Sequence, residues 1–162
     1  MKSATVKQLK DELKNINQVE LAELVLRLSR FKKENKELLT YLLFEAHNEE
    51  GYIETVKQEV DEQFELINTN SYFYIKKSVR KILRIIKKFA RYSQKKETEV
   101  ELLIYFCYKL KDFTPSITNN VTLTNIYLRQ ILLIKKIVST LHEDLQYDYN
   151  LALEELENSA HN

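Results

Sequence analysis

Ten lysine and arginine residues, and no aspartate or glutamate, lie between Leu66 and Lys96 of this 162-residue chain. Cations spaced three or four residues apart share one face of a helix, where they can bind the phosphates of a polyanion. The preceding stretch, from Glu45 to Glu65, has the opposite bias, with eight acids against Lys57 alone. Because the formal net charge is only +1, this segregation of charge is the main functional lead.

On a helical wheel of about 100° per residue, eight of the cations fall within roughly 140°. Apolar residues between Ile75 and Tyr92 occupy the rest of the wheel and must face the core. The basic side therefore faces solvent or a partner, and each pair of neighbouring like charges costs a few tenths of a kcal/mol. The candidate polyanion- or partner-binding residues are Lys76, Lys77, Arg80, Lys81, Arg84, Lys87, Lys88 and Arg91.

Three environments could accommodate this basic face. We expect it to be solvated, or neutralised internally by acidic side chains of the preceding helix (54–65) or of the last helix. The alternative is an external polyanion, most naturally nucleic acid, with Tyr72, Phe73 and Tyr74 stacking on bases instead of packing in the core. An anionic membrane surface is not expected as a partner, because the apolar face is committed to the core.

Catalytic and metal signatures do not emerge from the residue pattern. A di-iron helical bundle needs Glu-x-x-His pairs, but Phe44 precedes His47 by three residues and Ser139 precedes His142. No Ser or Cys stands in a nucleophile motif, and one glycine is too few for a glycine-rich phosphate loop. We expect no metal, no cofactor and no enzyme activity, although a site assembled only in the fold stays possible.

Composition predicts an all-α protein. The chain is 44% hydrophobic and 30% charged and contains one Gly and one Pro, so long helices joined by short polar connections are favoured. The single cysteine, Cys107, lies in an apolar run and is expected to be buried. A reduced thiol, no signal-peptide core and no membrane-length apolar run indicate a cytoplasmic location. We expect one helical domain over 1–158 and a disordered tail at 159–162.

Apolar periodicity predicts seven or eight antiparallel helices, in an irregular bundle or a short α-solenoid-like arrangement, without a fixed-period repeat. Gly51 is expected to end the third helix, and the sixth, apolar on most sides, to be central. The predicted helices cover about 5–16, a second that Asn17 caps, 33–48, 52–68, a fifth from Ser71 to 93, 97–113, 125–145 and 149–158. The first helix is predicted to carry Val6, Leu9, Leu13 and Ile16 on one face. The predicted inward residues of the second and third are Leu21, Leu24, Val25, Leu28, Leu38, Leu39, Leu42, Leu43 and Ala46.

Two resemblances concern the N-terminal part. The segments 6–13 and 20–24 resemble the SAP DNA-binding hairpin, but only residues 14–19 connect them and no glycine is present. The segments 9–16, 20–28 and 33–37 resemble uncharacterised bacterial all-helical proteins of a domain-of-unknown-function family, in which a basic helix also follows the second helical pair. That resemblance covers about the first 95 residues and implies a bacterial helical fold without a known activity.

These observations lead to three functional hypotheses. The first is a non-catalytic protein–protein interaction or scaffold module, self-associating through complementary acidic and basic faces. The second is nucleic-acid binding through the basic helix around 76–91. The third is a small-ligand protein or enzyme with a site between helices.

Overall fold

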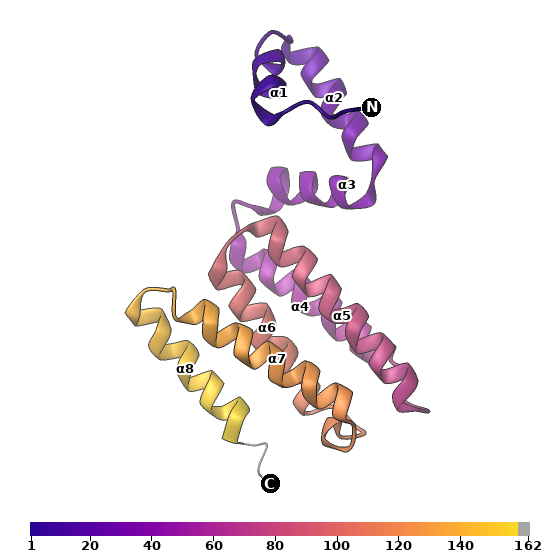
Figure 1. Ribbon diagram of the computed structural model, residues 1–162, viewed down its shortest axis with the longest axis vertical. Helices are drawn as coiled ribbons and strands as arrows, with labels where there is room; N and C mark the ends of the chain where they lie inside the picture. The colour runs from indigo at the N-terminus through magenta and orange to yellow at the C-terminus, as the bar shows by residue number, and fades with distance from the viewer. Residues whose placement is uncertain (159–162) are drawn as a thin grey trace. The chain divides into compact units, whose positions relative to one another are not determined.

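The computed structural model describes residues 1–158, and this part of the chain forms eight α-helices and no strand (Figure 1). The predicted all-α class is therefore confirmed, whereas the predicted disordered tail, 159–162, lies outside the described residues. The chain divides into two compact units, Met1–Glu45 (unit 1) and Ala46–Asn162 (unit 2). The sequence instead predicts one domain over 1–158, because periodicity alone does not say which helices share a core.

Unit 1 is built from amphipathic helices, and side chains cap the starts of the first two. The side chain of Thr5 caps α1 in a capping box with Gln8, and Asn17 Oδ1 accepts a hydrogen bond from the Glu20 amide at 2.9 Å. Lys32 is extended (φ −139°, ψ 145°) and separates α2 from α3. The elements are α1 (Val6–Leu13), α2 (Gln18–Phe31), α3 (Lys33–Thr40) and the π-helical turn η1 (Tyr41–Glu45).

The apolar faces predicted to point inward in unit 1 are mostly exposed. Val6 is 82% exposed and Leu28 is 61% exposed, and only Ser29 and Tyr41 are buried among the described residues of this unit. Ile16, Val25, Leu39 and Ala46 are half-buried, the last lying just beyond unit 1. The prediction of a covered core face is wrong here, because the spacing of apolar residues shows which of them share a face but not whether anything packs against it.

Unit 2 is a two-layer stack of antiparallel helices. Helix α6 packs between α4 and α8, and these three helices form layer A. Helix α5 packs on α4 and α6, and α7 packs on α6 and α8. Helices α5 and α7 form layer B. The elements are α4 (Glu49–Glu65), α5 (Tyr72–Ser93), α6 (Lys96–Lys111), the short 3-10 helix η2 (Ile117–Asn119), α7 (Val121–Val138) and α8 (Glu143–Asn158).

A regular spacing of 44 residues links successive helix pairs, although the sequence shows no repeat. Six hydrogen bonds join residues 44 apart. Three lie within layer A, and the other three join helix ends or the segments that flank them, as from Tyr72 Oη at the start of α5 to the Ser116 carbonyl just before η2. The helical hairpins therefore stack in equivalent register. Of the two architectures predicted, the short solenoid-like arrangement describes unit 2 better than an irregular bundle.

The core of unit 2 lies around α6, as predicted. Phe106, Leu103 and Cys107 are fully buried, and the apolar stripe predicted for the fourth helix is also buried. Leu153 and Leu156 of α8 are 2% and 0% exposed, so the last helix also contributes to this core. Described core residues of α4 and its end are Tyr52, Ile53, Val56, Val60, Phe64 and Ile67.

Several helix boundaries differ from the predicted ones. Gly51 lies in the first turn of α4 and does not end a helix: its amide donates to Asn48 Oδ1, and a Cβ added there would lie 2.5 Å from Asn48 Nδ2. The seventh helix starts and ends earlier than predicted, because Asn120 caps α7 and Thr140 Oγ1 donates to a carbonyl of its last turn. The last helix accordingly starts at Glu143, six residues before the predicted 149.

None of the helices among residues 1–158 combines the length and the apolar character that crossing a membrane requires.

Candidate functional site

The basic face of α5 is positioned by the burial of its opposite side. Six of the eight predicted site residues are exposed, and Lys76 and Lys88 are half-buried. Buried residues recurring every three or four positions fix the helix against α4 and α6. These anchoring residues are Ile75, Val79, Ile82, Ile86 and Ala90.

The described acidic residues do not neutralise this face. Seven of the eight cations make no ion pair with any residue in 1–158. The eighth, Lys88, places its Nζ 4.9 Å from the centre of the Phe89 ring. Of the two environments expected from the sequence, solvation or internal neutralisation, these seven side chains therefore show no neutralising ion pair. The seven are Lys76, Lys77, Arg80, Lys81, Arg84, Lys87 and Arg91.

Two acids of α4, Glu54 and Asp61, contact basic groups within layer A. Asp61 Oδ1 lies 2.9 Å from Lys109 Nζ and accepts a hydrogen bond from Tyr105 Oη at 2.6 Å. Lys57 bridges Glu54 within α4 and Glu101 of α6. Packing of α4 on α6 thus directs these carboxylates along layer A and away from the cations of α5.

The pKa values in layer A follow from these pairs. Burial raises the pKa of Tyr105 to about 12, and its hydrogen bond to Asp61 adds to the effect. Burial alone would raise the pKa of Asp61, but the bond from Tyr105 and the pair with Lys109 outweigh it and hold that pKa below its ordinary value. Burial would likewise lower the pKa of Lys57, but Glu54 and Glu101 outweigh it, so the pKa is raised.

The two layers carry opposite charge. Helices α5 and α7 of layer B contain eleven lysines and arginines and no acid, whereas α4, α6 and α8 of layer A contain sixteen acids and four basic residues. Sequence reasoning missed the contribution of α7, whose Arg129 and Lys136 are exposed and make no ion pair within 1–158. The absence of acids between 121 and 138 is the signal that could have found them.

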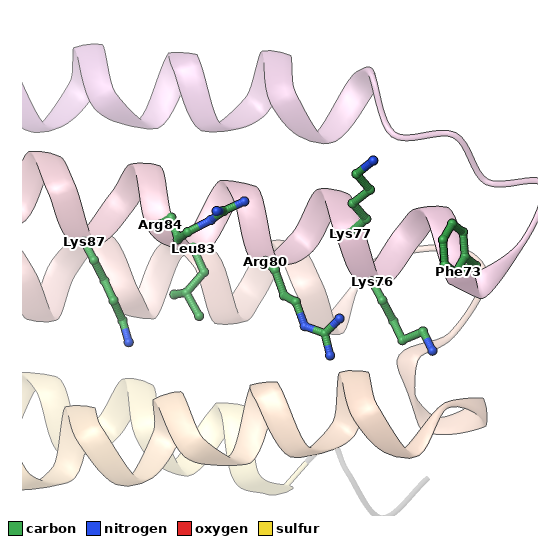
Figure 2. Close-up of a pocket in the computed structure, with 7 residues that line it drawn as sticks. All are labelled: Phe73, Lys76, Lys77, Arg80, Leu83, Arg84 and Lys87. Atoms are coloured by element: carbon green, nitrogen blue, oxygen red, sulfur yellow. The ribbon is translucent and has the colours of Figure 1, made fainter. Parts of the chain in front are cut away.

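A hollow of about 650 Å³ follows the outer side of α5. Figure 2 shows Lys76, Arg80, Leu83 and Lys87 projecting to one side of this helix and Lys77 to the other. Phe73 lies at the helix start. Cationic side chains therefore line most of the hollow, with the apolar Phe73 at one end and Leu83 near the middle. The lining residues are Phe73, Lys76, Lys77, Arg80, Leu83, Arg84 and Lys87.

The aromatic residues that begin α5 divide into two kinds. Tyr72 is half-buried and donates from Oη to the Ser116 carbonyl at 2.9 Å, so it has a structural role. Phe73 and Tyr74 are 68% and 47% exposed, and their rings meet edge to face at 5.5 Å. Core packing does not account for these two rings, which leaves them open to stack on a planar ligand.

Other candidate chemistry finds little geometric support in the described part of the chain. No group of three or more His, Cys, Asp or Glu residues in 1–158 is placed to hold a metal ion. His142 pairs only with the nearby Asp144, with both side chains exposed. Cys107 is fully buried, as predicted, and burial raises the pKa of its thiol to about 12, so the unreactive protonated form dominates at neutral pH.

The chain matches no protein-family model, no curated protein and no solved structure. Its resemblance to a bacterial helical family therefore stays a prediction, and the functional argument depends on the site.

Proposed function

We propose that this protein binds a polyanion, and specifically nucleic acid, through the outer face of layer B. The observation that carries the proposal is the row of seven cations on α5 without an ion pair in the described chain. From Lys76 to Arg91 the helix rises roughly 22 Å, at about 1.5 Å per residue. Eight cations over that length approach the charge spacing of one DNA strand, which has a phosphate about every 3.4 Å of helix axis.

Two features favour nucleic acid over an acidic protein. Phe73 and Tyr74 offer exposed rings at the end of the cationic hollow, and stacking of a base on such a ring contributes roughly 1–3 kcal/mol. Arginine, present at Arg80, Arg84 and Arg91, also contacts phosphates in a bidentate fashion. The face carries no base-reading motif, so affinity should come from the backbone and depend little on sequence.

The experiment is a fluorescence-anisotropy titration with labelled single-stranded and duplex oligonucleotides of mixed sequence, between about 50 and 200 mM salt. With three to five phosphate contacts, log K should fall with log[salt] with a slope of about −2 to −5. Combined substitution of Arg80→Glu, Arg84→Glu and Lys87→Glu should weaken binding at least about 30-fold, because three attractive contacts become repulsive.

A matched control replaces three exposed cations of unit 1, Lys7→Glu, Lys10→Glu and Lys14→Glu, which changes the formal charge equally. Its affinity should stay within about threefold of the unmodified protein, since α5 is untouched. Failure of the unmodified protein to bind at low salt would refute the proposal, as would an equal loss in the control. Equally tight binding of poly-glutamate would show that an acidic protein, and not nucleic acid, is the partner class.

The hypothesis of a protein–protein interaction module also has a specific observation in its favour. Unit 1 leaves large apolar side chains such as Val6, Leu28 and Phe31 exposed, and contiguous apolar surface is typical of protein interfaces. Its support thus comes from unit 1, and not from the complementary charged faces that the sequence suggests. The cytoplasmic location expected from the sequence stays a prediction.

A further inference from the structure

The apolar surface of unit 1 is extensive for so small a unit. Thirteen large apolar residues between Val6 and Phe44 are exposed, by 36% to 82% of their surface. Ser29 and Tyr41 are the buried residues among the 45 of this unit. Such a unit buries too little apolar surface to offset the entropy of ordering its own chain. Its stability must therefore come from a surface outside it.

The apolar surface of unit 1 includes a hollow between α2 and α3. It measures about 260 Å³ and is lined mainly by apolar side chains. The Asn35 side-chain amide donates to the Leu28 carbonyl at 2.8 Å and holds the bend between the two helices. The apolar lining residues are Val25, Leu28, Leu38, Leu39 and Leu42.

Along α2, acidic residues come first and basic residues follow, placed symmetrically about Val25. Glu20 and Glu23 precede Val25 by five and two residues, and Arg27 and Arg30 follow it by two and five. On a wheel of about 100° per residue, all four lie within roughly 80° on one flank. That flank borders an apolar stripe formed by Leu21, Leu24, Leu28 and Phe31.

This order selects a particular partner. When two identical helices pair antiparallel about a two-fold axis, the same flank of each helix meets in reversed order. Glu20 and Glu23 of one copy then lie beside Arg30 and Arg27 of the other, so that opposite charges meet. A second copy of this chain is therefore the complementary occupant.

The available area is compatible with such a pair. A large apolar side chain that is fully exposed presents roughly 60–120 Å² of apolar surface to solvent. The thirteen residues, which lie on α1, α2, α3 and η1, together expose on the order of 500–800 Å² per copy, so a pair centred on α2 reaches this area when the neighbouring helices of unit 1 join the contact. A standard stable interface buries about 800 Å² per partner.

We propose that unit 1 is a homodimerisation element, in which α2 pairs antiparallel with α2 of a second copy and covers the apolar stripe. The proposal does not depend on nucleic-acid binding by α5, and its test contains no nucleic acid.

The test measures the mass of the full chain by light scattering across protein concentrations, with three charge-reversed variants. Reversing only the acids (Glu20→Arg, Glu23→Arg) or only the bases (Arg27→Glu, Arg30→Glu) should raise the dimer dissociation constant at least about tenfold, because like charges then meet. The variant with all four changes should dimerise within about threefold of the unmodified protein. An equimolar mixture of the two double variants should form a heterodimer.

The four side chains are exposed, so circular dichroism should report the same helix content in each variant when dimers are compared. A chain that is monomeric at every concentration would overturn the proposal, because something other than a second copy would then cover the stripe. Equal dimerisation of the double variants would overturn it too, as would failure of the fourfold variant to recover. Rescue by the fourfold variant and by mixing is the result that a merely unfolded variant could not produce.

Discussion

Units 1 and 2 are both built from helices that carry apolar residues, but the two units differ in whether those residues are buried. In unit 2, residues such as Phe106, Leu103 and Leu156 are completely buried, and helices cover one another in two layers. In unit 1, a higher density of leucine, 10 of 45 residues against 14 of 117 in unit 2, still leaves side chains such as Leu28 and Phe31 at 61% and 79% exposure. An amphipathic sequence thus places apolar residues on one face of a helix, but neighbouring helices are needed to bury that face and to stabilise the helix.

The polar contacts differ in the same way. In unit 1, side-chain contacts such as the hydrogen bond from Asn35 to the Leu28 carbonyl and the ion pair of Lys33 with Glu37 join residues that are close in the chain. In unit 2, several span 44 residues or more, as from Tyr105 to Asp61 or from Thr98 to Glu49. Long-range contacts tie helices into one cooperative body, whereas local ones stabilise single turns. The comparison teaches that unit 2 is complete by itself and unit 1 is not.

The largest expected effect comes from removing matched phenylalanines from the two units. Phe106 is fully buried and its ring lies 6.1 Å from that of Phe64, so Phe106→Ala should lower the free energy of unfolding by about 3–5 kcal/mol. Phe31 is 79% exposed, so Phe31→Ala should change it by less than about 0.5 kcal/mol. Urea titrations at low protein concentration, where unit 1 is unpaired, measure both.

The two phenylalanine variants also serve as controls for each other. At high protein concentration, Phe31→Ala should weaken self-association, because it removes part of the apolar stripe. A loss of several kcal/mol for Phe31→Ala at low concentration would contradict the contrast between the units, since it would place that ring in a core.

A smaller effect should follow from breaking one long-range polar tie of unit 2. Asp61→Asn removes the charge that contacts Tyr105 and Lys109. It should lower the free energy of unfolding by on the order of 1–2 kcal/mol at neutral pH, a modest value because the Asp61 side chain is 39% exposed and solvent screens its charge. Because the pKa of Asp61 is lowered in the folded state, its contribution is present above the ordinary carboxyl pKa of about 4. That contribution is lost as pH falls through the folded-state value.

Urea unfolding between neutral and acid pH checks the sign of this dependence. The unmodified protein should lose stability below about pH 4 faster than Asp61→Asn does. Glu62→Gln is the matched control on the same helix, since Glu62 is exposed and makes no ion pair in the described chain. If the acid dependence were unchanged in Asp61→Asn but altered in Glu62→Gln, it would come from Glu62, and the prediction for Asp61 would be wrong.

Local features of the fold were predictable from the sequence. The bounds of α5 agree with the expected 71–93, and the buried stripes of α4 and α6 follow from a helical period that depends only on neighbours in the chain. The end of α7 was not predictable in this way, because Ser139 and Thr140 end it through side-chain bonds to carbonyls of its last turn. The exposure of the apolar faces of unit 1 was not predicted, because it depends on whether other helices cover them, which the spacing of apolar residues does not show.

The candidate site was predictable in its residues but not in its environment. All eight cations were identified from spacing alone. Whether carboxylates neutralise them depends on which helix the acids of α4 contact, and Asp61 finds Tyr105 and Lys109 on α6, 44 and 48 residues away in the chain. The 44-residue register was likewise invisible, because it lies in the pairing of unlike residues such as Lys57 with Glu101 and not in repeated identities.

The smallest and most discriminating expected effect compares two equivalent helix caps. Asn120 Oδ1 accepts from the Leu123 amide at 3.1 Å at the start of α7, and Asn17 Oδ1 accepts from the Glu20 amide at 2.9 Å at the start of α2. Asn120→Ala should lower the unfolding free energy by about 1 kcal/mol, the ordinary value of a cap in a cooperative body. Asn17→Ala should leave the main urea transition unchanged and reduce only the helix signal in far-ultraviolet circular dichroism. Equal shifts of the transition in the two variants would mean that units 1 and 2 unfold together, in which case unit 1 draws its stability from within the chain and needs no second copy.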